Sequence, residues 1–312
     1  MRNNDVLTDD GVHFQRTITA MITPFDPTGK YVDYDQLRAL AEAQVQAGNS
    51  VCILGTTGEA PTIEEGNRGA EDERGRIIRE VVDQVRNRVR VIVGTGTNFT
   101  SDAVGHTNQA AELGADGVLV VTPYYNKPSQ RDIVDNYYRP IGEVDLPVIM
   151  YDIPGRTATK MDPETIVEAS RLPGIIGLKF ASGDFDQLRQ VRRDAPNLPI
   201  WSGDDANTLN VMREGGVGVV SVASNADPNR VHNLVDLASQ ENWDGAQAID
   251  TELAELIKAC FPEGWSNPRG IKYLMHLMSR GAIHNVFRQP LGPLPEEFRP
   301  RYQAILTKLG LI

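Results

Sequence analysis

Ile175-Ile-Gly-Leu-Lys-Phe-Ala181 is a short apolar run with a lysine near its end. A run this short and β-branched predicts a buried strand. A lysine is unexpected there, because burying an unpaired ammonium group is costly. Two interpretations follow for Lys179. Either it reaches solvent or a carboxylate at the strand end, or it is a neutral amine that forms a Schiff base with a carbonyl substrate.

The rest of the chain contains seven more runs of this kind, each followed by a segment with helical spacing. The eight expected strands are 17–24, 51–55, 90–94, 117–122, 147–151, 175–181, 198–202 and 216–222. The expected helices between and after them are 35–47, one opened by a capping box of Thr62 and Glu65, then 101–114, 131–141, 162–171, 184–193, 205–214 and 229–239. Three further helices, at 251–259, 269–280 and 295–309, follow without any strand pattern.

Eight strand–helix units are the number that a (β/α)8 barrel needs. A doubly wound sheet also alternates strands and helices, but it usually has fewer strands and a Gly-rich phosphate turn after the first one, which is missing here. We therefore predict an α/β fold, a (β/α)8 TIM barrel over residues 14–240 that is the catalytic domain. A C-terminal α-helical domain follows over residues 241–312, and residues 1–13 are expected to form a flexible tail.

The bulk composition restricts the partners. The formal net charge of −11 argues against binding to nucleic acid or to an anionic membrane surface. No apolar stretch approaches the roughly 20 residues that a membrane span needs. The acidic N-terminus has no apolar core, so neither a secretory signal nor a transit peptide is expected. Cys52 and Cys260 form no motif, and a reducing cytoplasm is the expected location.

Catalytic groups of such barrels lie at the C-terminal ends of the strands. Those ends carry Thr56, Thr57, Tyr124, Tyr125, Tyr151, Arg156, Lys179, Gly203, Asp204, Asp205 and Ser221. Gly177 and Lys179 share one face of their strand, and we expect the glycine to leave space for the lysine in the barrel interior. Burial there disfavours the charged form of an amine, which would leave a nucleophile.

Other kinds of chemistry have weaker support. The five histidines lie away from the strand ends and show no metal-ligand spacing, so no metal is expected. Asp204 and Asp205 argue against a phosphorylated substrate in the loop after the seventh strand. Gly94-Thr-Gly-Thr97 lacks the third glycine of a dinucleotide motif and is interpreted as an ordinary loop.

Five segments carry a family resemblance. They are Gly55-Thr-Thr-Gly-Glu59, Val121-Thr-Pro-Tyr-Tyr-Asn-Lys-Pro-Ser-Gln130, Tyr151-Asp-Ile-Pro-Gly-Arg-Thr157, Gly177-Leu-Lys-Phe-Ala181 and Ser202-Gly-Asp-Asp205. Together they resemble the dihydrodipicolinate synthase/N-acetylneuraminate lyase family of pyruvate-dependent class I aldolases. The resemblance extends from about residue 16 to the C-terminus.

The resemblance implies catalytic roles. Lys179 would form the Schiff base with pyruvate, and the backbone N–H groups of Thr56 and Thr57 would hold the pyruvate carboxylate. Tyr151 would move protons at the imine and at the attacking carbon. Thr57 would link Tyr151 to Tyr125, which in this family comes from a neighbouring subunit. A relay of hydroxyl groups suits such proton transfers.

The resemblance also implies how the second substrate is held. Arg156 would bind its carboxylate, Gly203 would lie near it, and Val220 would place a backbone carbonyl beside the imine. An arginine fork matches a carboxylate well. The implied partner chains form a homo-oligomer of at least two copies, usually a tetramer built as a dimer of dimers.

The implied reaction is the condensation of pyruvate with L-aspartate 4-semialdehyde to 4-hydroxy-tetrahydrodipicolinate, in lysine and diaminopimelate biosynthesis. The covalent imine on Lys179 carries this chemistry without a cofactor. Alternatives are an aldolase or dehydratase of the same family that acts on a 2-keto-3-deoxy sugar acid or on N-acetylneuraminate, and a non-catalytic pyruvate-binding homologue. Arg156 favours the semialdehyde, because the sialic-acid and sugar-acid members typically lack it.

Two departures from the family pattern bear on regulation and specificity. Lysine-inhibited members have two histidines where this chain has Glu65 and Arg68, so weak or no inhibition by lysine is expected. Asn98 and Tyr124 still match that regulatory site, with Asp102 for the usual glutamate. Asn267-Pro-Arg-Gly-Ile-Lys272 departs from the more usual Asn-Pro-Ile-Pro-Val-Lys. This segment is expected to border the pocket and to bear on the choice of aldehyde.

Overall fold

The computed structural model describes residues 5–7, 13–64 and 72–312. Its centre is a closed barrel of parallel strands that follow one another in chain order, with the last strand paired to the first. The strands are β3 (Thr17–Ala20), β4 (Ser50–Ile53), β5 (Val91–Gly94), β6 (Gly117–Val121), β7 (Val148–Asp152), β8 (Ile175–Phe180), β9 (Ile200–Ser202) and β10 (Gly218–Ser221). Each strand falls on one of the eight predicted runs, although β3 ends four residues earlier than predicted and β9 and β10 each begin two residues later. The predicted (β/α)8 barrel is confirmed.

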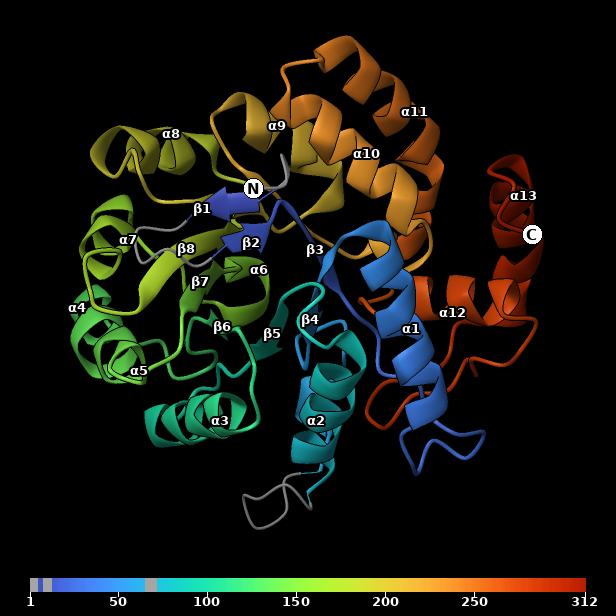
Figure 1. Ribbon diagram of the computed structural model, residues 1–312, viewed down its shortest axis with the longest axis horizontal. Helices are drawn as coiled ribbons and strands as arrows, with labels where there is room; N and C mark the ends of the chain where they lie inside the picture. The colour runs from blue at the N-terminus through green and yellow to red at the C-terminus, as the bar shows by residue number, and fades with distance from the viewer. Residues whose placement is uncertain (1–4, 8–12, 65–71) are drawn as a thin grey trace.

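Helices surround the barrel (Figure 1). Those of the barrel are α1 (Tyr34–Ala47), α2 (Glu73–Val85), α3 (Thr100–Glu112), α4 (Gln130–Asp132), α5 (Arg139–Gly142), α6 (Pro154–Thr157), α7 (Pro163–Ala169), α8 (Phe185–Asp194), α9 (Thr208–Arg213) and α10 (Pro228–Ser239). Short 3-10 turns precede or connect some of them: η1 (Ala60–Thr62), η3 (Asp205–Asn207) and η4 (Ala223–Asn225). A π-helical segment, η2 (Ile133–Tyr138), joins α4 to α5.

Helix α1 illustrates how local signals set these boundaries. The side chain of Asp33 accepts a hydrogen bond from the backbone N–H of Gln36 and so caps the first turn. The helix ends at Gly48, whose φ of 77° is the left-handed conformation that favours glycine. Both signals are local in the sequence, and the predicted helix 35–47 matches the observed one closely.

Helix α2 begins later than predicted. Thr62 closes the short turn η1, and its hydroxyl donates to the carbonyl of Glu59 instead of capping a helix. The helix starts at Glu73, where Asp72 accepts from the backbone N–H of Gly75. The expected capping box at Thr62 is therefore wrong, and its second member, Glu65, lies outside the described residues.

A short antiparallel pair precedes the barrel. Strand β1 (Asp5–Leu7) lies within the segment predicted as a flexible tail, and it pairs with β2 (His13–Gln15). The Phe14 ring is fully buried and lies against Gly117, the first residue of β6. The backbone carbonyl of Gln15 accepts a hydrogen bond from the indole of Trp201, 3.4 Å away. Strand β2 therefore packs against the N-terminal ends of the barrel strands and leaves the opposite end for the site.

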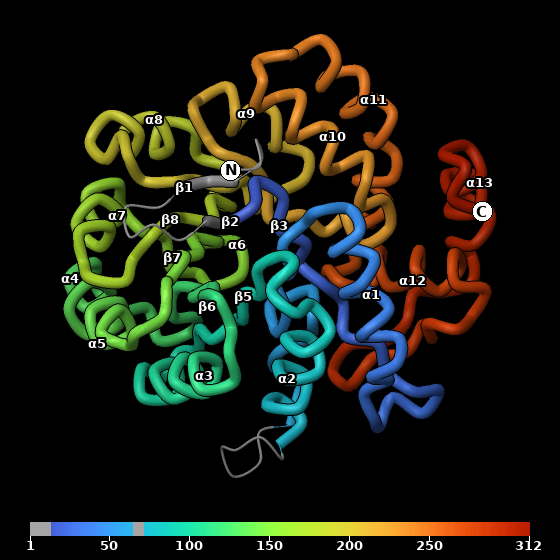
Figure 2. The backbone as a smooth tube through the Cα atoms, viewed as in Figure 1, coloured from blue at the N-terminus to red at the C-terminus, as the bar shows by residue number. Residues whose placement is uncertain are grey.

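The C-terminal region is helical, as predicted. It consists of α11 (Trp243–Cys260), α12 (Arg269–Met278), η5 (Glu296–Phe298) and α13 (Arg299–Lys308), and Figure 2 follows the chain from α10 through α11 to α12 and α13 at the right of the view. Helix α11 starts eight residues before the predicted position, because Asn242 caps it through the N–H of Gly245. Buried rings join α12 to α13, with Tyr273 and Tyr302 5.5 Å apart.

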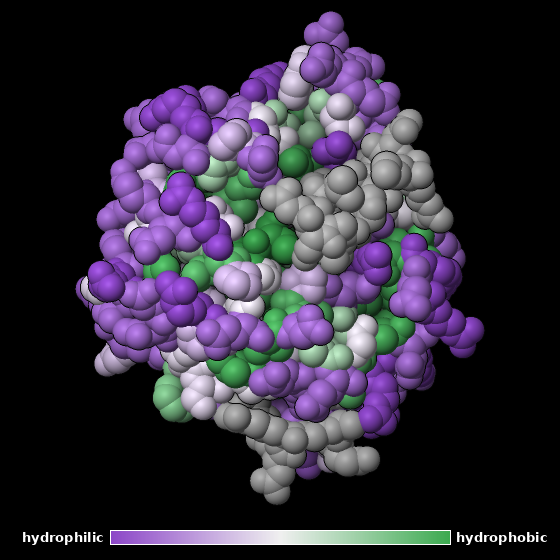
Figure 3. Space-filling view, turned by 60° about the vertical axis from the view of Figure 1, so that its left-hand side comes forward, coloured by the Kyte–Doolittle hydropathy of each residue, from purple (hydrophilic) through white to green (hydrophobic). Residues whose placement is uncertain are grey.

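The surface seen in Figure 3 is mainly hydrophilic, as expected for a barrel surrounded by amphipathic helices whose apolar sides face inward. In Figure 3, hydrophilic side chains cover most of the visible face, and hydrophobic residues show between them in its middle. Within the described residues no helix is long and apolar enough to cross a membrane.

Candidate active site

Lys179 lies inside the barrel, near the C-terminal end of β8. Its Cα is paired in register with Tyr151 on β7, and its Nζ lies 4.2 Å from the centre of the Tyr151 ring. Both residues are only 6 % exposed. Among the described residues no carboxylate forms an ion pair with Lys179. The solvent-exposed and ion-paired interpretations of this lysine are therefore wrong for the described part of the chain.

Two glycines shape the surroundings of Lys179 in different ways. A Cβ at Gly177 would lie 2.6 Å from the Trp201 ring, so the space beside this glycine is filled by the indole and is not open as expected. A Cβ at Gly203 would lie 3.0 Å from Cε and 3.1 Å from Cγ of Lys179. Gly203 therefore packs directly on the lysine stem, while Gly177 makes room for a core residue.

The contact at Gly203 gives a direct prediction. Replacing Gly203 with alanine would push a methyl group against Lys179 and, at 2.7 Å, against the Ala181 Cβ. We expect the displaced amine to lower kcat/KM for pyruvate roughly 10-fold, because a small misplacement of a reacting group is costly. Steady-state kinetics checks this. The matched control is Gly292→Ala, where nothing lies within 4 Å of the added Cβ and no loss is expected. Equal kinetics for the two variants would contradict the packing account.

The loop after β4 carries Thr56 and Thr57. It turns sharply, since Leu54 and Glu59 have φ values of 55° and 56° in the left-handed region. Among the described residues the backbone N–H groups of Thr56 and Thr57 donate to no acceptor. Adjacent free N–H groups form a binding site for an anion such as a carboxylate. Thr57 itself is almost completely buried.

The C-terminal region holds this loop at two points that the sequence did not reveal. Asn267 Nδ2 lies 3.0 Å from Thr57 Oγ1. Lys272 and Glu59 form an ion pair in which neither side chain is exposed. Burial raises the pKa of Glu59 and lowers the pKa of Lys272, and the attraction between the two charges opposes both shifts. Because 210 residues separate Asn267 from Thr57, no local pattern could have found this contact.

Asp205 holds the end of β10, next to Val220. Its buried carboxylate accepts from the Ser221 hydroxyl and from the backbone N–H groups of Val222 and Ala223, at 2.8 and 3.3 Å. Burial raises the pKa of Asp205, and these hydrogen bonds oppose the rise. Asp204, in contrast, caps η3 by accepting from the N–H of Ala206. The two neighbouring acidic residues therefore have structural roles at this edge of the barrel.

Asp152, which follows Tyr151 on β7, is also buried. It accepts from the backbone N–H of Met161 at 3.2 Å and from the side chain of Gln187 at 3.1 Å. Burial raises the pKa of Asp152 to about 6, against the effect of these hydrogen bonds. Its partners lie on the segments around α7 and α8, so this carboxylate ties β7 to the surrounding helices.

Among the described residues, no hydrogen bond or ion pair joins Lys179 to the predicted site residues Arg156, Val220 and Tyr125. Arg156 is exposed on α6 and has no ion-pair partner among the described residues. Val220 is buried in β10. Tyr125 is 87 % exposed, with a φ of 76°. Within the described chain no hydrogen bond joins Thr57 to either tyrosine of the expected relay.

The segment Asn267–Lys272 differs from the family's usual sequence, and its unusual Arg269 contacts other parts of the C-terminal region. Arg269 donates from Nε to the carbonyl of Gly292, 2.9 Å away, and its guanidinium lies 5.2 Å from the centre of the Trp265 ring. Both partners belong to the C-terminal region. The unusual arginine is therefore engaged there. Among the residues described, Asn267 and Lys272 are the members of this segment that bind the loop, through Thr57 and Glu59.

Some of the positions that match the family's lysine-inhibition site lie within the described residues, and others do not. Glu65 and Arg68 lie outside the described residues, so the expected weak inhibition by lysine stays a prediction. Of the matching positions, Asn98 accepts from the side chain of Asn126 through its backbone carbonyl, 2.8 Å away. Tyr124 is partly exposed.

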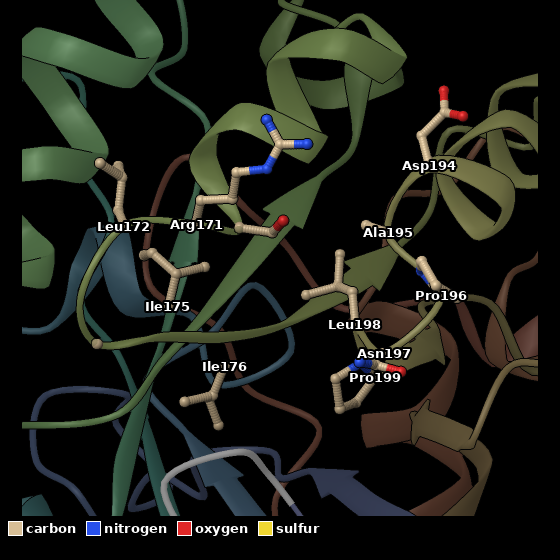
Figure 4. A pocket seen from close by; sticks show the side chains of 12 residues that line it. Arg171, Leu172, Ile175, Ile176, Asp194, Ala195, Pro196, Asn197, Leu198 and Pro199 are labelled. Atoms are coloured by element: carbon tan, nitrogen blue, oxygen red, sulfur yellow. The ribbon is translucent and has the colours of Figure 1, made fainter.

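A cavity of about 490 Å³ lies elsewhere in the molecule (Figure 4). It is lined by the first residues of β8, Ile175 and Ile176, and by residues just before β8 and β9, including Leu198, with Arg171 and Asp194 at its edge. These loops are at the N-terminal ends of the strands, opposite the end where barrel enzymes carry their catalytic groups. We therefore place the candidate active site at Lys179. In the described part of the chain no group of three or more His, Cys, Asp or Glu residues could hold a metal ion.

A (β/α)8 barrel with a buried lysine at the C-terminal end of its sixth strand, without an ion-pair partner in the described chain, has the architecture expected of a Schiff-base aldolase. Residues 13–309 match the model of the dihydrodipicolinate synthetase family, and the chain belongs to that family.

The similarity extends over nearly the whole chain. The chain is 38% identical over 300 residues to a 4-hydroxy-tetrahydrodipicolinate synthase of Coxiella burnetii, covering 96% of this chain and 99% of that protein. It is 39% identical over 292 residues to the Pseudomonas aeruginosa protein of the same name, covering 93% and 96% of the two chains. Among solved structures, a chloride-inhibited dihydrodipicolinate synthase of Acinetobacter baumannii in complex with pyruvate has a TM-score of 0.88 at 34% identity, covering 96% of this chain and all (100%) of that one.

Proposed function

We propose that the protein is a lyase that condenses pyruvate with L-aspartate 4-semialdehyde to 4-hydroxy-tetrahydrodipicolinate, through a Schiff base on Lys179. The observation that carries the proposal is the buried Lys179 amine, which contacts the Tyr151 ring and has no carboxylate partner among the described residues. The names of the relatives from Coxiella burnetii and Pseudomonas aeruginosa support the choice of substrates.

The proposed chemistry follows from an amine meeting a ketone. Lys179 adds to the carbonyl carbon of pyruvate, and loss of water gives the imine. The imine withdraws electrons, so the methyl group loses a proton and an enamine forms. The enamine carbon attacks the aldehyde, whose oxygen gains a proton and becomes a hydroxyl. The amino group of the second substrate then attacks the imine carbon, closes the ring and displaces Lys179.

The predicted site residues have definite roles in this sequence. The free N–H groups of Thr56 and Thr57 bind the pyruvate carboxylate, and Tyr151 carries protons to and from the imine and the new bond. Arg156, which is exposed and unpaired among the described residues, is available for the carboxylate of the second substrate. Val220 and Gly203 border the imine, and Gly203 also sets the position of the lysine stem. The imine withdraws the electrons that a cofactor would otherwise withdraw, so the reaction needs none.

A comparison of second substrates tests the proposal. After loading with pyruvate, we expect turnover with L-aspartate 4-semialdehyde in a coupled assay. Cleavage or dehydration of 2-keto-3-deoxygluconate should be at least about 100-fold slower, since a site built for one polar partner rejects another strongly. A preference for the sugar acid would reject the proposed substrate and leave the Schiff base standing.

The assembly is part of the proposal. A tyrosine that is 87 % exposed and held at a φ of 76° is unusual on the surface of a single chain. We infer that Tyr125 reaches the site of a second copy, so that the protein is a homo-oligomer of at least two chains, in the family's dimer-of-dimers tetramer. We also propose a cytoplasmic location, which the two free, buried cysteines support.

Mixing two inactive variants tests the shared tyrosine. We expect Lys179→Ala and Tyr125→Ala each to have little activity alone. In a mixed dimer one site combines an intact Lys179 with the partner's intact Tyr125. Random exchange of chains should therefore restore about one quarter of the wild-type activity. If the tyrosine acted within its own chain, the mixture would be no more active than its components.

A further inference from the structure

Asn267 reaches the proposed site from the C-terminal helical region. It stands just before α12, is 7 % exposed, and places its Nδ2 3.0 Å from the Thr57 hydroxyl. Its own turn is held by the hydrogen bond from the Lys272 N–H to the Pro268 carbonyl, at 3.0 Å. The contact therefore joins a fixed segment to the hydroxyl that stands at the middle of the proposed relay.

The chemistry of the two groups gives this contact a direction. An amide nitrogen can only donate, whereas a hydroxyl has one hydrogen and two lone pairs. Thr57 therefore accepts from Asn267, and its own hydrogen stays free for another acceptor. The reverse amide orientation would bury both N–H groups without an acceptor among the described residues. The present orientation leaves only Oδ1 without a partner, and unpaired buried carbonyls are less rare than unpaired N–H groups.

We propose that Asn267 is a positioning residue that makes Thr57 a hydrogen-bond donor toward the tyrosine relay. The inference rests on the proposed function, in which Thr57 passes protons between Tyr151 and Tyr125. An amide at this place sets which way the hydroxyl hydrogen points before any substrate binds. The relay would then be oriented by a residue that touches neither the imine nor the substrate.

A second attachment separates this role from simple support of the loop. The buried pair of Glu59 and Lys272 fastens the same loop to α12, two residues beyond Thr57. A change at Asn267 leaves that pair in place. Substitutions at Asn267 can therefore change the hydrogen-bond direction while the loop stays anchored.

The test compares Asn267→Asp with Asn267→Ala across pH. A carboxylate can only accept, so at high pH the aspartate variant draws the Thr57 hydrogen away from the relay. As pH falls, the carboxyl gains a proton and can donate again. We expect kcat of N267D, divided by wild-type kcat at the same pH, to be about 100-fold down at the alkaline end and to rise as pH falls. The same ratio for N267A should be about 10-fold down and independent of pH.

Two further readouts accompany the kinetics. Borohydride reduction with pyruvate should trap as much adduct at Lys179 in both variants as in the wild type, because both keep the Lys179 amine and the N–H groups that bind the pyruvate carboxylate, and the final amount trapped does not depend on how fast the relay moves protons. The matched control is Asn285→Ala. Asn285 also donates one hydrogen bond from Nδ2, to the Leu294 carbonyl, and also has an unpartnered buried Oδ1, but among the described residues it makes no hydrogen bond to the loop. Its kcat should be unchanged.

Different results would reject the positioning role of Asn267 and the proposed function. A pH-independent ratio for N267D, or adduct formation that falls together with kcat, would overturn the positioning role. If N267D did not fold, N267A would decide, since an unchanged kcat in that variant would overturn the role as well. Failure of the wild-type protein to trap pyruvate would instead reject the proposed function itself.

Discussion

Replacing Lys179 with alanine should abolish turnover, with kcat lowered by roughly 10⁴- to 10⁶-fold, as for other residues that form the covalent intermediate. The amine is the only group in the proposed mechanism that can form the imine. Lys179→Arg should be equally inactive, because a guanidinium keeps the charge but does not act as a nucleophile. Steady-state assays and intact-mass measurement after reduction with pyruvate check both variants.

The control for this variant is a lysine on the surface. Lys160 forms an ion pair with Asp184 at 2.6 Å, with both side chains well exposed to solvent. Lys160→Ala should keep full turnover and lose less than about 1 kcal/mol of stability, as is usual for exposed pairs. Residual turnover of Lys179→Ala above about one tenth of the wild-type rate would rule out the Schiff base as the main route.

Replacing Lys272 with methionine should produce the largest loss of stability. The substitution leaves the Glu59 carboxylate buried without its partner, which costs about 3–5 kcal/mol. The pair also fastens the Thr56-Thr57 loop, so turnover should fall together with the free energy of unfolding. Denaturant unfolding of Lys272→Met checks the loss, and Lys160→Met is the matched surface control.

The pH dependence of this loss has a definite sign. Burial already raises the pKa of Glu59 in the intact pair, and removing Lys272 removes an interaction that opposes the rise. A carboxyl whose folded-state pKa is raised carries no penalty below its unfolded pKa, where both states are protonated, and gains the penalty as pH increases. The deficit of Lys272→Met should therefore shrink on acidification. A deficit that grew on acidification would contradict the buried-charge explanation.

A double substitution separates charge from packing. When Glu59 and Lys272 are both replaced by methionine, no charge is left unpaired, and the stability should return to within about 1–2 kcal/mol of the wild type. A double variant as unstable as Lys272→Met would mean that packing around the pair, and not the uncompensated charge, accounts for the loss.

The barrel could be predicted because its signals are local. Each strand is a short apolar run whose two faces are both buried, so it reads as continuous hydrophobic sequence. The start of α2 could not be predicted in the same way. Thr62 and Glu65 form a correct capping pattern, but the Thr62 hydroxyl donates to the Glu59 carbonyl, and the helix begins at Glu73 with Asp72 as its cap. Asp72 offers a local capping signal of its own, and the described helix uses that one.

The site residues that lie on the barrel strands could be predicted from the sequence. The contacts between the site and the C-terminal region could not. Lys179 and Tyr151 come from neighbouring strands whose register follows from the barrel. Asn267 and Lys272 approach the loop from more than 200 residues away in sequence, so their contacts depend on how the C-terminal helices pack. The role of Gly177 was misread for the same reason, since only the fold brings Trp201 against it.

The central claim is that the Lys179 amine forms an imine with pyruvate. Incubating the protein with pyruvate, reducing it with borohydride and locating the modification by peptide mass spectrometry tests this directly. We predict a single reduced pyruvate adduct on Lys179, absent without pyruvate and absent from Lys179→Ala. No adduct, or an adduct on another lysine with Lys179 unmodified, would contradict the account.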